Sequence, residues 1–289
     1  MNVLVLGPCG TIGTSVTAAL LLRGHAVTGL VRSGDSARQL ESSGGRPIRG
    51  DIRRPAEWAA IVDEVDAIIN VAGDFTDDAG SIDRQLVDAL LQRSGRDQHR
   101  RTMIWTGGCW LYGATGDRIA TEETPFDPLP AFAWCVEHLR LLLADPRIRG
   151  IAIHPAMVYE RDGGVFSPFQ RDLLDRREIR IVGNARVRWP LVHRDDIGLL
   201  YALALERALP GSSFNGAAIE SFPVATIASA MAKRFGVSGA PLVRTAEDMA
   251  HEHGEWARGY ALDQAMSGDK ARRELGWHPT HRNPLADVE

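Results

Sequence analysis

Short apolar runs alternate with helical patterns along the N-terminal part of the chain, and this alternation restricts the protein to very few folds. Val3 to Leu6, Ala26 to Val31, Asp66 to Val71 and Thr102 to Thr106 are short runs rich in apolar and β-branched residues. Runs of this length and composition are typical of buried strands. A briefer run, Pro47 to Ile48, is expected to form a further strand.

Helical patterns separate these strands. Thr11 to Leu22 repeats its apolar residues at helical spacing, and Ser81 to Gln92 is expected to form a long helix. Ser36 to Ser43 is expected to form a short helix, and Pro55 to Val62 begins with proline, a common first helical residue. Strict alternation of strand and helix predicts an α/β protein with a Rossmann-type, doubly wound parallel sheet and helices on both faces.

The alternation loosens after Gly113. A helix over Phe132 to Leu143 and a sixth strand over Gly150 to Pro155 are still expected. Further helices are expected over Asp195 to Glu206, Pro223 to Phe235 and Gly268 to Leu275. These later pieces are typical of a smaller lobe over the carboxyl edge of the sheet, where ligands bind in such folds. We therefore expect one structural unit, with residues 1–160 as the NAD(P)-binding domain and residues 161–289 mainly as a substrate-binding lobe, while later residues also supply core strands.

Three glycines occupy the turn between the first strand and the first helix, in the spacing GxxGxxG from Gly7 through Gly10 to Gly13. Glycine allows the tight turn, lets the backbone approach a pyrophosphate, and lets helix and strand pack closely. The free N–H groups of the helix start, from Thr11 and Ile12 onward, favour an anion. A plain strand-to-helix turn would need fewer of these features, so the sequence predicts dinucleotide binding at this turn.

The residues after the second strand favour NADP over NAD. An NAD site usually has Asp or Glu at this point to bond the ribose hydroxyls, whereas NADP sites use Arg for the 2′-phosphate. No acid lies at positions 30–33, Arg32 is at the right distance, and Arg38 lies about one helical turn beyond. We therefore predict NADP as the cofactor, with NAD as the alternative, in which case Arg32 is a solvated surface charge.

Two further strand ends are predicted to border the cofactor. Asp51 and Ile52 follow the third strand and are expected at the adenine edge, unless Asp51 belongs to a helix N-cap region. Val71-Ala72-Gly73 ends the fourth strand. Small residues at such a strand end let the backbone pass close to the cofactor.

Composition and charge exclude several other classes of protein. The formal net charge is −4 and the pI about 6.2, so neither nucleic acid nor a membrane surface is an expected partner. Three cysteines at irregular spacing fit neither a disulfide framework nor a zinc site. The N-terminus lacks the features of a signal peptide, and there is no run of about 20 apolar residues. We expect a cytoplasmic protein with a small-molecule substrate, and we leave a homodimer open.

Several further motifs, taken with the glycine turn, resemble those of one known family. They are Asp51-Ile52, Val71-Ala72-Gly73, Tyr112-Gly113, the stretch from His154 to Tyr159, which is similar to RPxxVYG, Val192 to Asp196, and Leu275 to Pro279. In this order they resemble the short-chain dehydrogenase/reductase superfamily, most closely its extended and atypical members, the NAD(P)-dependent epimerase/dehydratase-like proteins. The resemblance covers nearly the whole chain. It implies a Rossmann domain, a C-terminal substrate lobe, redox chemistry at C4 of a nicotinamide, and cofactor contacts from Pro155 and Met157.

The chain departs from this family at the residues that carry the chemistry. The family's catalytic set is a Ser or Thr four residues before the Tyr-Gly pair, followed by Tyr-x-x-x-Lys. Gly108 stands four residues before Tyr112, and the segment from Pro130 to His138 contains neither Tyr nor Lys. No lysine precedes Lys233. The standard proton donor is therefore absent, together with the lysine that would lower its pKa.

Three explanations remain open. In the first, another group handles the proton, and Tyr112, Thr106 and His138 are the local candidates, since a histidine titrates near neutrality and suits acid–base work. In the second, Tyr112 packs structurally, His138 is a surface residue, and water or a substrate group completes the proton flow. In the third, the protein is a cofactor-binding sensor without turnover.

Aromatic and basic residues mark the expected substrate region. Trp105, Trp110 and Trp134 cluster around the expected nicotinamide end, where they either line an aromatic pocket or fill the core. Arg186 and Arg188 either bind a carboxylate or phosphate or belong to a solvated basic loop. The sequence thus predicts an NADP(H)-dependent oxidoreductase or epimerase/dehydratase-like enzyme for a small carbonyl or hydroxyl compound, such as a sugar nucleotide or a secondary metabolite. The alternative is a non-catalytic NADP(H)-binding sensor.

Overall fold

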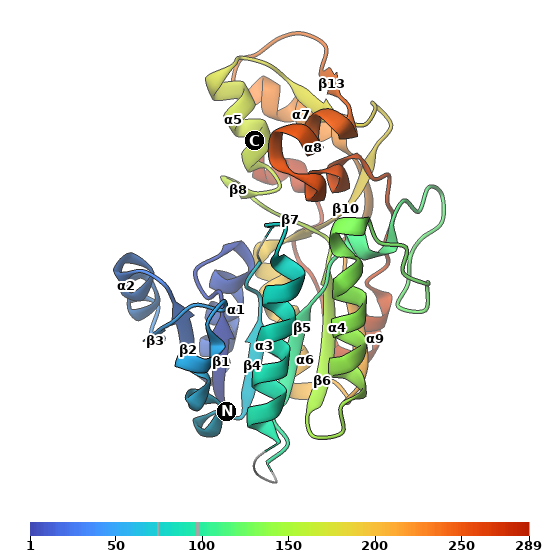
Figure 1. The fold of residues 1–289 in the computed structure, drawn as a ribbon. Coiled ribbons are helices and arrows are strands. Elements are labelled where there is room, and N and C mark those ends of the chain that lie inside the picture. The colour runs from blue at the N-terminus through green and yellow to red at the C-terminus, as the bar shows by residue number, and fades with distance from the viewer. Residues whose placement is uncertain (74, 96–98, 289) are drawn as a thin grey trace.

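A seven-stranded sheet forms the centre of the molecule in the computed structural model, which describes residues 1–73, 75–95 and 99–288 (Figure 1). The strands are ordered β11-β6-β5-β4-β1-β2-β3, and every neighbouring pair is parallel. Their bounds are β1 Asn2–Leu6, β2 Ala26–Val31, β3 Arg46–Arg49, β4 Ala67–Asn70, β5 Thr102–Thr106, β6 Arg149–Pro155 and β11 Ser212–Gly216. The predicted α/β class and Rossmann-type parallel sheet are confirmed.

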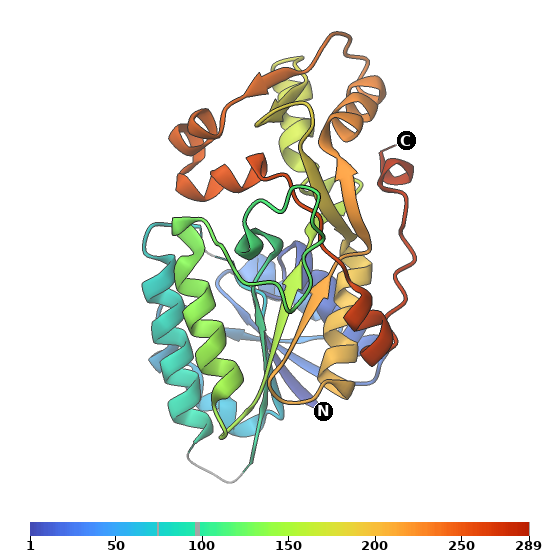
Figure 2. The ribbon, with the colours of Figure 1, turned by 90° about the vertical axis from the view of Figure 1, so that its right-hand side faces the viewer.

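Helices cover both faces of this sheet (Figures 1 and 2). α1 (Thr11–Leu22) and α6 (Arg194–Arg207) pack on one face, and α3 (Ala79–Ser94) and α4 (Ala133–Ala144) pack on the other. Successive side chains of a strand point to opposite faces, so the valines of β1 join the first core and its leucines join the second. The sheet is therefore buried on both sides, which explains why its central strands are continuous apolar runs.

The contact between α1 and α6 ties a late segment of the chain to the first helix. A Cβ atom at Gly198 of α6 would lie 2.6 Å from the carbonyl carbon of Ser15, so only glycine allows the two helices to approach this closely. At the other end of the pair, Arg23 donates to both carboxylate oxygens of Glu206. Residues 194–216 thus return to the parallel sheet and add α6 and β11 to it.

A smaller lobe lies at the carboxyl ends of the sheet strands (Figure 1, top). It contains a four-stranded sheet in the order β12-β10-β7-β8 and a two-stranded sheet of β13 and β9. The strands are β7 Met157–Glu160, β8 Gly163–Gly164, β9 Arg180–Val182, β10 Arg188–His193, β12 Ile219–Pro223 and β13 Leu242–Arg244. The helices are α5 Ser167–Asp175, α7 Val224–Arg234, α8 Ala246–His253 and the 3₁₀ helix η5 Glu255–Ala261. The chain ends with α9 Asp269–Leu275 and η6 Pro284–Asp287.

Two expectations about local structure need correction. The single helix predicted over residues 55–62 is instead two 3₁₀ helices, η1 Pro55–Glu57 and η2 Ala59–Glu64. Trp58 interrupts them, because its buried indole donates to the carbonyl oxygen of Asp51 at 2.7 Å and its φ is −130°. The seventh sheet strand, β11, was not predicted, because its sequence SSFNG contains one large apolar residue and it lies at the edge of the sheet.

The remaining elements bring loop residues to the same carboxyl edge. α2 (Gly34–Ser42) follows β2, and Ser33 caps it by accepting a hydrogen bond from the Ser36 amide. The 3₁₀ helices η3 (Cys109–Tyr112) and η4 (Pro130–Phe132) follow β5 and precede α4. Among the helices of the described ranges, none has the length and apolar character that a membrane crossing requires.

Candidate cofactor and active site

The glycine turn brings the ends of β1 and β4 together. Gly7 has a φ of +83°, which favours glycine, and a Cβ there would lie 2.8 Å from the Ala72 Cα. Gly13 is equally restricted, because a Cβ would lie 1.9 Å from the carbonyl oxygen of Gly7. These two glycines shape the turn itself.

Gly10 differs from the other two glycines of the turn. Its backbone is extended (φ −77°, ψ 173°), and the nearest atom to an added Cβ is the Gly7 carbonyl oxygen, at 3.7 Å. Gly10 also lines the cavity that opens in front of the turn. Packing within the protein therefore does not require glycine at position 10. Glycine is expected there if a ligand approaches the backbone.

A cavity of about 440 Å³ lies at the carboxyl ends of β1, β2 and β4. Because β1 lies between β4 and β2 in the sheet, this is the point where the strand order reverses, and open α/β sheets bind ligands at such points. The lining residues are Gly7, Pro8, Cys9, Gly10, Leu30, Val31, Arg32, Ser33, Ser36, Gly50, Ile52, Val71, Ala72 and Gly73. Seven of the predicted cofactor residues are among them: Gly7, Gly10, Arg32, Ile52, Val71, Ala72 and Gly73. The cavity thus lies at the point of the sheet where a dinucleotide was predicted to bind.

The start of α1 points its backbone donors at this cavity. Gly10 is the N-cap, no side chain caps the helix, and its first turn contains no acid. Thr11, Ile12 and Gly13 make up that first turn, so their amides are the ones left for a ligand. An uncapped helix N-terminus next to a cavity favours a phosphate group.

Arg32 stands at the end of β2 with its side chain exposed. In residues 1–73, 75–95 and 99–288 it makes no hydrogen bond or ion pair with another side chain. The hydroxyl groups of Ser33 and Ser36 lie beside it on the cavity wall, bonded to each other at 3.0 Å. None of the lining residues is acidic. This corner of the cavity therefore offers a positive charge and two hydroxyls to an anion.

The other predicted cofactor residues do not line the cavity. Arg38 forms an ion pair with Asp35 on the exposed side of α2. The Asp51 carboxylate accepts a hydrogen bond from the Arg53 amide at 2.9 Å, which is a turn-capping contact. Pro155 and Met157 are buried where β6 passes into β7. Arg38 and Asp51 thus have local partners, and their predicted contact with the cofactor stays a prediction.

The structure also adds lining residues that the sequence did not single out. Pro8 and Cys9 lie inside the glycine turn, and Gly50 follows β3. Ser33 and Ser36 were missed because they were taken only as residues near the start of a helix. The signal was present, since a serine N-cap directly after the second strand faces the same edge as the glycine turn.

Tyr112 is placed as a structural residue. Its side chain is 4% exposed, its hydroxyl donates to Asn215 Oδ1 at 2.8 Å, and its ring packs on Phe126 and His154. Burial raises the pKa of Tyr112 well above its ordinary value. The hydrogen bond to Asn215 and the packing on two rings give Tyr112 a structural role, and its predicted role as proton donor stays a prediction.

Thr106 and His138 are likewise occupied by the fold. The Thr106 hydroxyl donates to the Asn70 carbonyl oxygen and lies 2.6 Å from the Tyr201 hydroxyl, which ties β5 to β4 and α6. His138 is buried, contrary to a surface position, and its Nδ1 lies 2.7 Å from Asp83 Oδ2 between α4 and α3. Both side chains therefore have partners within the fold, and their predicted part in catalysis stays a prediction.

Gly108 leaves open space where the family carries a hydroxyl. Its backbone is extended (φ 167°, ψ 164°), and an added Cβ would meet no atom within 4 Å. The neighbouring Gly107 is closely packed, because a Cβ there would lie 2.3 Å from His154 Nδ1. The open space at Gly108 faces away from the packed core, as a residue bordering an active site would.

The three tryptophans expected near the nicotinamide separate into two groups. Trp105 is buried and donates to Asp83 Oδ1 at 3.0 Å, and Trp134 packs on Gly80 and His138. These two belong to the core between α3 and α4. Trp110 instead contacts the aromatic rings of η4 and η5, and its indole N–H is buried without an acceptor in the described part of the chain.

Arg188 is held by the lobe rather than left for a substrate. Its guanidinium donates to both carboxylate oxygens of Asp263, at 2.9 and 2.6 Å, and to the Gly116 carbonyl oxygen. Arg186 is exposed. The hypothesis that these two arginines bind a substrate anion is therefore not supported for Arg188.

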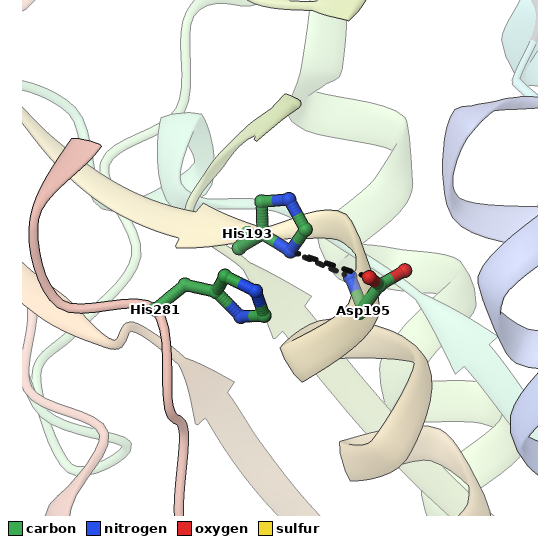
Figure 3. Close-up of side chains that lie close together, drawn as sticks. All are labelled: His193, Asp195 and His281. Atoms are coloured by element: carbon green, nitrogen blue, oxygen red, sulfur yellow. Dashed lines mark hydrogen bonds and ion pairs between the residues drawn. The ribbon is translucent and has the colours of Figure 1, made fainter. Parts of the chain in front are cut away.

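A cluster of metal-ligating residue types lies at the start of α6. His193, Asp195 and His281 bring ligand atoms within 4.8 Å of one another (Figure 3). His193 Nδ1 already accepts from the Asp195 amide at 3.2 Å, and His281 Nδ1 lies 3.1 Å from Asp196 Oδ2. The two imidazoles stack at 3.8 Å, so they lie face to face instead of converging on one point. This cluster fastens the C-terminal segment to α6.

The chain matches one family model and is similar over its length to proteins of other organisms. Residues 3–216 match the model of the NAD dependent epimerase/dehydratase family. The uncharacterized protein C2A9.02 of Schizosaccharomyces pombe is 28% identical, over 100% of this chain and 98% of that protein. The 4-hydroxy-2-methyl-3-oxo-4-farnesyl-3,4-dihydroquinoline-1-oxide ketoreductase of Stigmatella aurantiaca is 23% identical, over 99% of this chain and 95% of that protein.

Two solved structures share the fold over the full chain. Human epimerase family protein SDR39U1 with NADPH superimposes with a TM-score of 0.79 at 19% identity, covering 100% of this chain and 98% of that one. dTDP-glucose 4,6-dehydratase from Bacillus anthracis in complex with NAD gives a TM-score of 0.81 at 16% identity, covering 100% and 95%. The family match spans most of the chain and bears out the resemblance in the motifs. The chain belongs to the NAD dependent epimerase/dehydratase family.

Proposed function

We propose that the protein is an NADP(H)-dependent oxidoreductase that reduces a small ketone to an alcohol, or performs the reverse reaction. The observation that carries this proposal is Arg32, which has no side-chain partner among the described residues and lines a cavity without a carboxylate in its lining. An acid at the end of β2 would bind the ribose hydroxyls of NAD, whereas a guanidinium binds the 2′-phosphate of NADP. One similar protein is named a ketoreductase, and of the two similar structures one contains NADPH and the other NAD.

Each part of the cavity has a role in this proposal. The amides at the start of α1 and the open backbone of Gly10 take the pyrophosphate. Arg32, Ser33 and Ser36 take the 2′-phosphate, and Ile52 covers one side of the adenine. The segment from Val71 to Gly73 leads toward the nicotinamide end. When bound, the nicotinamide supplies or accepts a hydride at its C4 atom.

The proton has no protein donor of the family's usual kind. Reduction places the hydride on the carbonyl carbon, and the carbonyl oxygen then takes one proton to give the alcohol. α4 contains neither Tyr nor Lys, and Gly108 has no hydroxyl. We infer that water supplies this proton. Because a positioned general acid typically contributes about 10²–10⁴-fold, the turnover should be slow for an enzyme of this family.

Arg32→Glu tests the proposal. The variant should weaken NADP⁺ binding by roughly tenfold to a hundredfold, because one charge-assisted bond contributes about 1.5–3 kcal/mol. NAD⁺ binding should change by less than about twofold. The matched control is Arg38→Glu, which removes an arginine of α2 that is paired with Asp35 outside the cavity. Equal losses for NADP⁺ and NAD⁺ in isothermal titration calorimetry would show that Arg32 is only a surface charge.

A sensor without turnover is the second candidate function. The missing hydroxyl at Gly108 and the absence of Tyr and Lys from α4 favour it. A redox sensor has to bind NADPH and NADP⁺ with different affinities and need not consume either one. Different affinities for the two forms, combined with no NADPH consumption across a panel of ketones and aldehydes, would favour the sensor over the enzyme.

A further inference from the structure

A continuous series of aromatic rings connects the cofactor cavity with a second cavity in the lobe. We call this series the aromatic row. Its members, in order, are Phe75, Trp256, Trp110, Tyr260, Trp189 and Phe169. Successive ring centroids lie 4.7, 6.3, 5.3, 5.8 and 6.1 Å apart. These spacings lie within the range of direct aromatic contact, so the row is one packed surface.

The first end of the row lies beside Gly73, at the edge of the cofactor cavity. Gly73 lines that cavity, and a Cβ built on Gly73 would lie 3.4 Å from Cε2 of the Phe75 ring. Phe75 is 55% exposed, and its ring contacts that of Trp256 at a tilt of 38°. Trp256 belongs to η5, which lies above the upper ends of α3 and α4 (Figure 2). Phe75 therefore places an exposed aromatic ring beside Gly73 of the cofactor cavity.

The second end of the row forms the floor of the lobe cavity. This cavity has a volume of about 200 Å³, and Phe169, Trp189 and Tyr260 line it together with Val165 and Ile181. An apolar cavity of roughly 150 Å³ is large enough to bind benzene. The lobe cavity therefore has room for one aromatic ring with a small substituent.

The charged rim of the lobe cavity is largely neutralised. Four arginines line it, and three of them are paired with carboxylates in the described part of the chain. The pairs are Arg180 with Glu178 at 2.8 Å, Arg244 with Glu252 at 3.0 Å and Arg176 with Asp172 at 3.7 Å. Arg171 alone lines the cavity without an ion pair in residues 1–73, 75–95 and 99–288. A diphosphate would have to displace these acids, whereas an apolar ring would leave them in place.

We propose that the substrate is a planar, apolar ring compound bearing the ketone or alcohol, and that it binds along the aromatic row. This inference rests on the proposed function for the reaction, but the binding site is defined by the row itself. The ring packs on the aromatic side chains, and the reacting carbon points to the nicotinamide end near Gly73. A ligand oxygen beside Trp110 would also supply the acceptor that its indole N–H lacks.

Binding to the complex with NADP⁺ tests the aromatic row without requiring turnover. Acetophenone and cyclohexyl methyl ketone form a matched pair, with one planar ring and one puckered ring, and dTDP-glucose represents the nucleotide sugars. Isothermal titration calorimetry should give acetophenone an affinity at least about tenfold higher than cyclohexyl methyl ketone. The proposal is overturned by equal affinities for the two ketones, by tighter binding of dTDP-glucose, or by no binding of acetophenone.

Substitutions in the aromatic row test whether acetophenone binds against its side chains. Phe75→Ala and Trp256→Ala should each weaken acetophenone binding about tenfold and leave the NADP⁺ affinity within about twofold. Phe75 is exposed, so its loss leaves folding intact, and Trp256→Phe keeps a ring and should restore most of the affinity. Leu174→Ala, an exposed apolar residue of α5 outside the row, is the control. Unchanged acetophenone affinity in both alanine variants contradicts the proposal. Normal binding without NADPH consumption refutes only the proposed reaction.

Discussion

Gly10→Val separates cofactor binding from folding more cleanly than any other change at the glycine turn. The Gly10 backbone is extended, so valine meets no strain, and the nearest protein atom to its Cβ is 3.7 Å away. The added methyl groups enter the cavity where the pyrophosphate meets the start of α1. Valine is a poorer N-cap than glycine, so the free energy of unfolding should fall by about 1 kcal/mol.

The loss of binding follows from the contacts that the valine displaces. Two charge-assisted hydrogen bonds from helix amides to phosphate, at about 1.5–3 kcal/mol each, correspond to roughly 3–6 kcal/mol. NADP⁺ affinity should therefore fall by at least about a hundredfold. Gly10→Ala, with one methyl group, should show a smaller loss.

Titration calorimetry of the two Gly10 variants, with circular dichroism melting to confirm folding, provides the test. Gly13→Ala is unsuitable, because its Cβ would collide with the Gly7 carbonyl oxygen at 1.9 Å and disturb the turn itself. A folded Gly10→Val protein that binds NADP⁺ as tightly as the wild type would refute the assignment of the cavity.

Three further predictions concern residues outside the cofactor cavity. Tyr112→Phe removes the hydrogen bond to Asn215 and should lower the free energy of unfolding by about 1 kcal/mol. The kcat should stay within about twofold of the wild type. A tenfold lower kcat would show that Tyr112 is the proton donor. His138→Ala removes one of the two hydrogen-bond partners of Asp83 and leaves Trp105 as the other, so the free energy of unfolding should fall by about 1–3 kcal/mol in urea denaturation, with kcat unchanged; lost activity at unchanged stability would contradict this reading. The hydrogen bond from Arg23, with that from His25, lowers the pKa of Glu206 from 4.5 to about 2, so its stabilising effect is complete above pH 4.5 and is lost as the pH falls through about 2. The melting temperature of Glu206→Gln should therefore lie below that of the wild type at pH 7 and approach it below pH 4; a constant difference at all pH values would show that the Glu206 charge is not responsible.

The central strands were predictable because each is buried on both faces by helices. Successive apolar residues occur in the central strands β1, β2, β4, β5 and β6. Such a run is sufficient to predict a parallel strand that is buried on both faces. β11 lies at the edge of the sheet and needs fewer apolar side chains, so its sequence gives no comparable signal. The short strands of the lobe were missed for a similar reason, since each has few residues and partners distant in sequence.

The cofactor site was largely readable from the sequence because its residues are local. Gly7, Gly10 and Arg32 lie directly after strands, and the parallel sheet brings all strand ends to one edge. The roles of the candidate catalytic residues could not be predicted, because their burial depends on partners distant in sequence. Tyr112 is fixed by Asn215 and His138 by Asp83, and neither partner could be identified from the local pattern.

The charge of an arginine was equally hard to judge without its partners. Arg38 and Arg188 both looked available for an anion, but Asp35 and Asp263 neutralise them. Arg32 has no such partner in the described ranges and keeps its predicted role as the proposed contact for the 2′-phosphate. Sequence position indicated where the arginines lie, and only the fold showed which of them have carboxylate partners.

Transfer of deuterium from NADPH labelled at C4 tests the central proposal most directly. The wild-type protein is incubated with a panel of ketones and with NADPH labelled on one face of C4 or on the other, and the alcohol products are analysed by mass spectrometry. The account predicts deuterium on the carbinol carbon from one labelled form only, because a cofactor held by the glycine turn presents a single face to the substrate. Tight NADPH binding with no labelled alcohol from either form would contradict the oxidoreductase and leave the sensor as the function of this fold.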